Sequence, residues 1–169
     1  SSLQETQPGV QFAVALDAGG AFTFRNQDAG SRLDLIKEVL KNWALTHDDL
    51  FLDDLTLVGN GGDISTHLTA AGFSDALSLY KPELQTLVAN LTTLSRALDL
   101  VTEPGTQTGM KRVVLFITSP TEAASIPALQ NLTQRAVSLG VRVHVWIISS
   151  SDYFNTSGAT ALKDLSILT

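Results

Sequence analysis

The sequence predicts a three-layer α/β domain, in which an open, mostly parallel β-sheet is covered by helices on both faces. Short apolar runs alternate along the chain with longer segments whose apolar residues recur at helical spacing. Such alternation is typical of parallel sheets, because each crossover between strands passes through a helix. The length of 169 residues suits one hydrophobic core. We therefore expect residues 10–169 to form a single domain, and residues 1–9 to be a flexible lead-in.

The amino-terminal part predicts a buried strand, a reversal and a helix. Residues 10–16 are apolar and partly β-branched, as in a buried strand, and a turn follows at Asp17. Residues 21–32 combine apolar–polar alternation with turn-forming residues, which predicts a small hairpin or an extended loop. Ser31 can cap the helix that follows. Its apolar residues lie at helical spacing, at Leu33, Ile36, Val39, Leu40 and Trp43.

The middle of the chain predicts two strands and two helices. Residues 50–58 form a strand region closed by glycines, and residues 64–68 form a strand that we place at an edge of the sheet. Residues 73–80 predict a short helix with Ser74 as its N-cap. The apolar period from Leu84 to Val101 predicts one long amphipathic helix.

The carboxyl-terminal part holds the strongest strand signal of the chain. Residues 113–118 are apolar and β-branched, so we expect a central strand beside residues 10–16. All of its apolar side chains should be buried, with Val114 and Phe116 on one face and Val113, Leu115 and Ile117 on the other. The remaining segments are a helix opened by Ser125 and Pro127 and ended by Gly140, a strand at 141–148, a polar loop at 149–158 and a helix at 159–168.

Composition excludes several classes of function. The net charge of −6 would repel nucleic-acid backbones, and no polybasic run is present for an anionic membrane. No apolar run reaches the roughly 20 residues that span a bilayer, so we expect no membrane insertion by this segment. The absence of cysteine excludes disulfides and thiolate zinc sites. Because the chain begins with Ser1 and not Met, we expect a mature or excised fragment.

Two polar segments follow the predicted central strands. Asp17 ends the first strand, and Thr118-Ser119-Pro120 ends the strongest one, so their loops should face each other at the carboxyl edge of the sheet. The order and spacing of the elements, with an apolar strand ending in Asp, resemble the von Willebrand factor A (vWA) family over residues 10–168. The resemblance implies a metal-ion-dependent adhesion site, built from Asp-x-Ser-x-Ser after the first strand, a Thr before a middle helix and an Asp after the central strand.

The adhesion-site motif is degenerate in this sequence. The first motif reads Asp17-Ala18-Gly19-Gly20-Ala21, so Gly19 and Ala21 stand where the family has serines, and Ser119 replaces the second carboxylate. Thr92 can be laid on the Thr position. Mg²⁺ prefers about six oxygen ligands, and one carboxylate cannot offset the loss of its hydration shell. We therefore expect no metal and no cofactor, with Asp17 and Thr92 as the only remaining ligands if weak binding persists.

An enzymatic alternative also uses Asp17. Haloacid dehalogenase-like phosphatases, another open α/β family, need Asp-x-Asp after the first strand and a Thr or Ser after a later strand. Thr118 fits the second requirement, but Gly19 removes the second Asp, which serves as the acid–base group. This alternative stays open beside the vWA-like hypothesis.

The sequence favours a non-catalytic protein-binding or scaffold module of a larger bacterial envelope or secreted protein, placed outside the cytoplasm. Its partner would be another protein or another domain of the same polypeptide. A binding surface should lie at the carboxyl edge of the sheet, because ligands of open α/β sheets bind there. The predicted partner-binding face comprises Asp17, Gly19, Gly20, Ala21, Thr92, Ser119 and Pro120.

Overall fold

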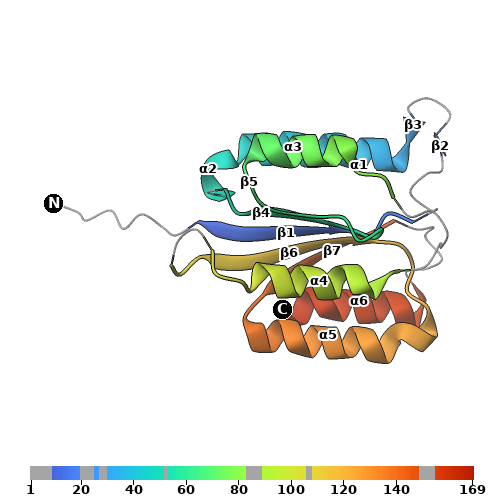
Figure 1. The fold of residues 1–169 in the computed structure, drawn as a ribbon. Helices are drawn as coiled ribbons and strands as arrows, with labels where there is room; N and C mark the ends of the chain where they lie inside the picture. Colours follow the sequence, from blue (N-terminus) through green and yellow to red (C-terminus); the bar gives the residue numbers. More distant parts are fainter. Residues whose placement is uncertain are drawn as a thin grey trace.

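The computed structural model describes residues 9–19, 25–26, 30–51, 53–82, 89–105, 108–148 and 155–169, which form three layers (Figure 1). The middle layer is a five-stranded sheet with the order β5-β4-β1-β6-β7. The strands are β1 (Val10–Leu16), β4 (Leu55–Gly59), β5 (Ile64–Leu68), β6 (Lys111–Thr118) and β7 (Arg142–Ile147). All neighbouring pairs are parallel except β4 and β5, which are antiparallel. The predicted fold class is confirmed, and β5 lies at one edge of the sheet, as predicted.

The central pair of strands is β1 and β6, as the sequence predicts. Their register runs from Val10 opposite Lys111 to Leu16 opposite Ile117. The side chains of β6 alternate between the two faces of the sheet. Val114 and Phe116 lie on one face, and Leu115 and Ile117 lie on the other. Val113 is only half-buried, contrary to the expectation that the whole strand is buried, because it lies near the amino-terminal end of β6 beside the exposed Arg142.

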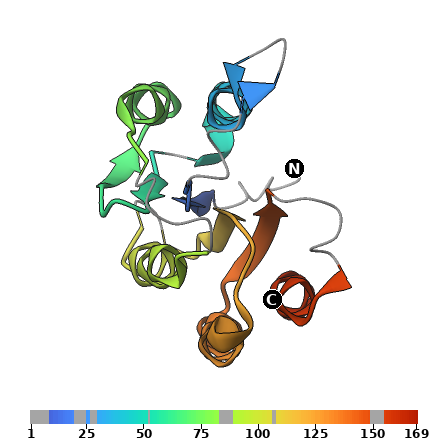
Figure 2. The same ribbon diagram turned by 90° about the vertical axis from the view of Figure 1, so that its right-hand side faces the viewer.

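Helices cover both faces of the sheet (Figures 1 and 2). One face carries α1 (Arg32–Thr46) and α3 (Ala70–Leu79), and the other carries α4 (Leu91–Val101), α5 (Ile126–Leu139) and α6 (Ser157–Leu168). A short 3-10 helix, η2 (Ala123–Ser125), precedes α5. Two apolar clusters fill the space between the layers, one around Leu40, Phe73 and Leu77 and one around Leu94, Leu98 and Leu129. Burial of this apolar surface is the main force that holds the layers together.

The start of α1 follows the sequence closely. Ser31 is its N-cap, and its hydroxyl accepts a hydrogen bond from the Asp34 N–H while the Asp34 carboxylate accepts one from the Ser31 N–H. This capping box satisfies two backbone donors of the first turn. Within the predicted hairpin region, β2 (Arg25–Asn26) pairs antiparallel with β3 (Gly30–Ser31). The rest of that region, residues 21–24 and 27–29, lies outside the described residues, as do residues 1–8 of the expected lead-in.

Two elements begin at other residues than the sequence predicts. The strand expected at 50–58 begins only at Leu55, since α2 (Asp48–Phe51) precedes it and buries Phe51 against Phe12 and Trp43. Carboxylates in its first turn suit the positive end of a helix. Similarly, α3 begins at Ala70 with Thr69 as its cap, so the assignment of Ser74 as an N-cap is also wrong.

The long helix predicted from Leu84 is a third correction. Ala89 and Asn90 are not helical, and α4 begins at Leu91 with the Asn90 side chain accepting a hydrogen bond from the Thr92 N–H. Residues 83–88 lie outside the described residues. The helical spacing of the apolar residues continues through Asn90, so the apolar pattern alone does not show the N-cap at which α4 begins. This correction places a loop in front of α4, where the vWA resemblance needs one.

Among the described residues, no helix combines the length and the apolar character needed to cross a bilayer.

Candidate functional site

Three segments converge at the carboxyl edge of the sheet, which faces the viewer in Figure 2. They are the end of β1 at Asp17, the end of β6 at Thr118 and Ser119, and the loop that leads into α4 at Asn90. Backbone hydrogen bonds hold them together, because the Asp17 N–H donates to the Ile117 carbonyl (2.8 Å) and the Ala89 N–H donates to the Pro120 carbonyl (2.8 Å). The predicted convergence of the Asp17 and Ser119 loops is therefore present.

The Asp17 carboxylate joins these three segments. Its Oδ2 atom accepts a hydrogen bond from the Asn90 N–H (2.7 Å) and another from the Thr118 hydroxyl (2.7 Å). The residue is only 1% exposed. A buried carboxylate that accepts hydrogen bonds from two loops fixes the position of both, since losing it leaves both donors unsatisfied.

Burial changes the acidity of this group. Removal from water raises the pKa of Asp17 from 3.8 to about 6, and the hydrogen bonds from Thr118 and Asn90 lower the pKa without offsetting the burial. Asp17 therefore changes its charge close to pH 6 in the folded protein.

Further buried oxygens at this edge have no hydrogen-bond partner among the described residues. They are the second carboxylate oxygen of Asp17 (Oδ1), the Thr93 hydroxyl and the Ser119 hydroxyl. Buried polar atoms are normally hydrogen-bonded, so unpartnered ones mark places where structure alone does not explain the residue type. The edge thus keeps unused hydrogen-bonding capacity beneath its surface.

The threonine at this edge differs from the one that the sequence analysis selects. Thr92 is exposed on the first turn of α4, whereas the neighbouring Thr93 is 98% buried, with 2% of its surface exposed. The signal for Thr93 is present in the sequence, because it lies four residues before Ala97 on the buried stripe of α4. The assumption of one helix from Leu84 hid the start of that stripe.

The other predicted site residues divide by burial. Gly19 and Ser119 are buried with Asp17, and Pro120 is half-buried. Among the predicted site residues that the structure describes, only Thr92 is fully at the surface. Gly20 and Ala21 lie outside the described residues.

The described residues do not fit a divalent metal site of the adhesion type. They supply one carboxylate, and one of its oxygens is already engaged by Asn90 and Thr118. No group of three or more His, Cys, Asp or Glu in the described part of the chain could hold a metal ion. The neutral hydroxyls of Thr93 and Ser119 add no charge to offset the dehydration of Mg²⁺.

A shallow cleft of about 180 Å³ opens beside the edge, between the turn after β4 and the start of α4. Gly61, Gly62, Thr92, Thr93 and Arg96 are among its lining residues, and Asp17 is not. The wall of the turn is held by Tyr80, whose hydroxyl donates to the Asn60 side-chain oxygen (2.6 Å). Burial raises the pKa of Tyr80 well above its ordinary value, so this hydroxyl remains protonated. Because Asp17 does not line this cleft, a molecule bound in the cleft would not contact the Asp17 carboxylate.

Comparisons with known proteins find similarity in structure alone. No protein-family model and no curated protein matches the chain. Proximal thread matrix protein 1 from the mussel byssus aligns with 95% of this chain and 47% of its own length, at 14% identity and a TM-score of 0.57. An aerotolerance-related membrane protein from Bacteroides fragilis aligns with 95% of this chain and 88% of its own length, at 17% identity and a TM-score of 0.51.

A third solved structure is BatB, a conserved hypothetical protein from Bacteroides thetaiotaomicron. It aligns with 81% of this chain at 22% identity and a TM-score of 0.48, and this chain spans 65% of its length. At these identities, the similarity of the mussel and Bacteroides fragilis proteins supports the three-layer α/β fold and does not extend to function.

Proposed function

We propose that this chain is a non-catalytic protein-binding or scaffold module of the vWA-like type, whose former metal-site positions serve structure in place of metal binding. The observation that carries the proposal is the state of Asp17. The carboxylate is buried and accepts hydrogen bonds from two other segments, where a metal ligand would need to face an ion and a partner. Asp17 accordingly holds the loops of the carboxyl edge in position, and the surface above them meets the partner.

Some of the predicted site residues can contact a partner, and the buried ones hold the contacting loops in position. Thr92 lies at the surface and Pro120 is half-buried, and the exposed turn at Gly61 and Gly62 lies across the shallow cleft from Thr92. Asp17, Gly19 and Ser119 position these loops from below. A shallow polar surface of this kind suits another protein or domain better than a small molecule, which would need a deep pocket.

We also propose that the module acts outside the cytoplasm, as part of a larger envelope or secreted protein. Two observations support this placement. The sequence resembles bacterial vWA proteins, and one structure with the same fold is described as an aerotolerance-related membrane protein. The partner is then another envelope protein or another domain of the same polypeptide.

Photo-crosslinking in the full-length protein tests the binding surface. A photoreactive residue is placed at Thr92 or at Gly61, and the control position is Glu103, which is exposed just beyond the carboxyl end of α4. We expect covalent adducts with a protein partner from Thr92 and Gly61 and none from Glu103 in the cells that produce the protein. Equal labelling at all three positions, or no adduct from the edge, would contradict the proposed surface.

A phosphatase-like enzyme is the second candidate, and one observation favours it. A carboxyl group with a pKa of about 6 is suited to proton transfer near neutral pH. Hydrolysis of p-nitrophenyl phosphate with Mg²⁺ separates the candidates. The binding-module proposal expects no rate above background, and a rate that disappears in Asp17→Asn would favour the enzyme instead.

A further inference from the structure

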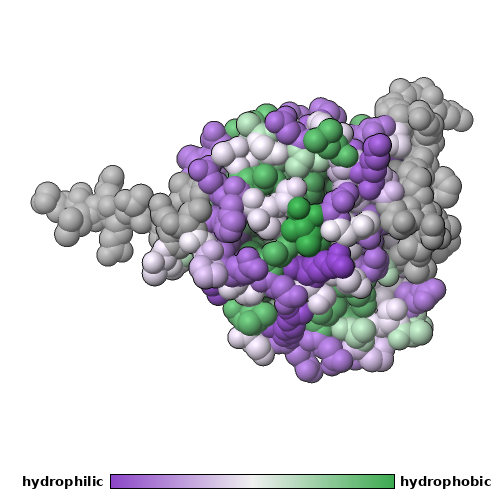
Figure 3. Space-filling view, viewed as in Figure 1, coloured by the Kyte–Doolittle hydropathy of each residue, from purple (hydrophilic) through white to green (hydrophobic). Residues whose placement is uncertain are grey.

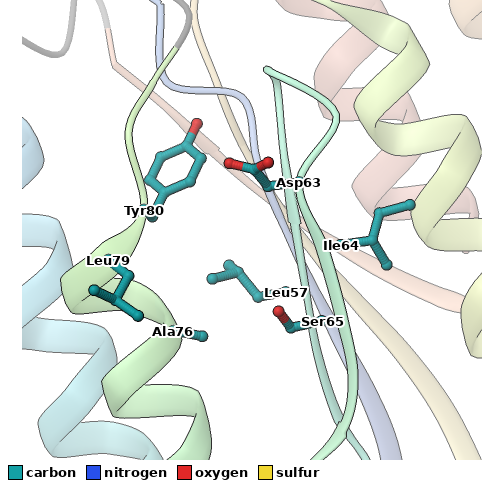
Figure 4. Close-up of a pocket in the computed structure, with 7 residues that line it drawn as sticks. All are labelled: Leu57, Asp63, Ile64, Ser65, Ala76, Leu79 and Tyr80. Carbon is teal, nitrogen blue, oxygen red and sulfur yellow. The ribbon is translucent and has the colours of Figure 1, made fainter.

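A groove lies at the open edge of the sheet, between β5 and α3 (Figure 4). Its volume is about 250 Å³, which is enough for one or two branched side chains. Figure 4 shows Leu57, Ala76 and Leu79 around its lower part and Asp63 with Tyr80 at its upper end. Ser65 of β5 faces the same side as its partner Leu57, whereas Ile64 points to the opposite face of the sheet.

The groove exposes more apolar surface than folding requires. Leu79 is 79% exposed beside the groove, although the groove floor at Leu57 is only 4% exposed. Figure 3 shows hydrophobic surface near the middle of this face, over the β4–β5 edge and the end of α3, with hydrophilic surface around it. An exposed apolar patch bordered by polar residues is typical of an interaction site.

The backbone of β5 offers a second element of recognition. β5 ends the sheet, and its outer edge pairs with no strand in the described part of the chain. Such an edge can hydrogen-bond an added extended segment. The irregular register near Leu55 and the left-handed conformation of His67 (φ 52°) interrupt the far end of β5. Regular pairing is therefore available only along Ile64–Thr66, the part that borders the groove.

The negative charge at the groove favours a basic peptide segment over an acidic one. The Asp63 carboxylate is exposed at the mouth and forms no ion pair among the described residues. Asp75 adds an exposed carboxylate on α3, and the whole chain carries a net charge of −6. A basic segment is attracted by this field, and an acidic one is repelled.

We propose that the groove between β5 and α3 binds an extended, basic peptide segment of a partner protein. The segment adds as a short strand to Ile64–Thr66, inserts one branched apolar side chain between Leu57 and Leu79, and presents a Lys or Arg to Asp63. This surface is separate from the carboxyl-edge surface around Thr92. It does not require that the carboxyl edge bind anything.

Two labelled peptides test the proposal by fluorescence anisotropy with the whole chain. The first is Gly-Lys-Val-Leu-Val-Lys-Gly, and the second has Glu in place of both Lys residues. We expect the basic peptide to bind at least about 10-fold more tightly, because attraction to Asp63 is exchanged for repulsion. Methylation of the peptide backbone nitrogens should abolish binding, since it removes the donors of the added strand while the protein is unchanged.

Protein variants locate the binding. Asp63→Lys should reverse the preference between the two peptides, and Leu79→Ser should weaken binding of the basic peptide. Ile167→Ser is the matched control, because Ile167 is similarly exposed on α6, on the other face of the sheet. Thr92→Ala separates the two proposals, since it alters the carboxyl-edge surface and should leave peptide affinity unchanged.

Three results would overturn the proposal. The first is absence of binding at millimolar peptide, and the second is equal affinity for both peptides that Asp63→Lys does not change. The third is self-association of the chain, detected by sedimentation equilibrium and lost in Leu79→Ser, which would assign the groove to a second copy of the protein.

Discussion

The middle of β1 and β6 and the carboxyl end of the same two strands are equally buried but chemically opposite. In the middle, Val14 and Leu115 pack against other apolar side chains. A few residues later, Asp17, Thr118 and Ser119 are just as inaccessible, yet they are polar, and Asp17 and Ser119 keep an unpartnered oxygen each. Burial of apolar groups stabilises the fold, whereas burial of a carboxylate costs free energy. The buried polar groups at this edge therefore cost stability, whereas the apolar middle of the same strands carries no such cost.

The largest expected effect lies in the middle of the strands. Leu115→Ala should lower the free energy of unfolding by about 2–5 kcal/mol, because it leaves a cavity in a packed core. Urea unfolding measures the change. Leu79→Ala is the control, since that side chain is mostly exposed and its loss should change stability by less than about 0.5 kcal/mol. A loss under about 1 kcal/mol at Leu115 would mean that the strand centre is not the core that we describe.

The carboxyl end should differ in its dependence on pH. The pKa of Asp17 is about 6 in the folded chain and about 4 when unfolded, so folding favours the protonated acid. The stability that Asp17 contributes is therefore full below pH 4 and is lost as the pH rises through 6. The loss amounts to about 3 kcal/mol, because each tenfold change in a protonation equilibrium equals about 1.4 kcal/mol.

Urea unfolding of the wild type and Asp17→Asn at several pH values isolates this effect, since Asn does not titrate. The stability of Asp17→Asn relative to the wild type should rise by about 3 kcal/mol between pH 4 and pH 8. The deficit of Leu115→Ala, which removes no titratable group, should stay constant over the same range. A constant difference for Asp17→Asn would show that the carboxylate is not buried as described.

A smaller effect is expected when one hydrogen bond to the carboxylate is removed. Thr118→Val keeps the shape of a fully buried side chain but removes the donor to Asp17. Above pH 6 the loss should be about 1.5–3 kcal/mol, because the acceptor is charged, and near pH 4 it should fall to about 1 kcal/mol. A loss that is the same at both pH values would contradict the direct bond between Thr118 and ionised Asp17.

The sheet, its central pair of strands and the edge strand at 64–68 could be predicted because the apolar runs are strong. Residues 113–118 and 10–16 can only be buried strands, and their alternation with helices sets a parallel arrangement. The element starts could not be predicted equally well. The apolar period of α4 continues backward through Asn90, so the cap that begins the helix is visible only once backbone hydrogen bonds are known.

The candidate site could be predicted in place but not in detail. Asp17 and Ser119 follow strands whose ends meet at one edge, and the structure brings them together. Thr93 was missed in favour of Thr92 because the choice depends on the first residue of the helix. The groove beside Leu79 was also missed, since it forms only where α3 packs against β4 and β5, and the sequence does not show that packing.

Metal titration tests the central claim that Asp17 serves structure and not ion binding. Calorimetry with millimolar Mg²⁺ and Mn²⁺, paired with thermal melts, measures it directly. We predict no binding heat and no shift in Tm for the wild type. An ion that binds the folded chain at 100 times its dissociation constant would add about 2.7 kcal/mol of stability. A metal-dependent rise in Tm that disappears in Asp17→Ala would contradict the account and indicate a working adhesion site.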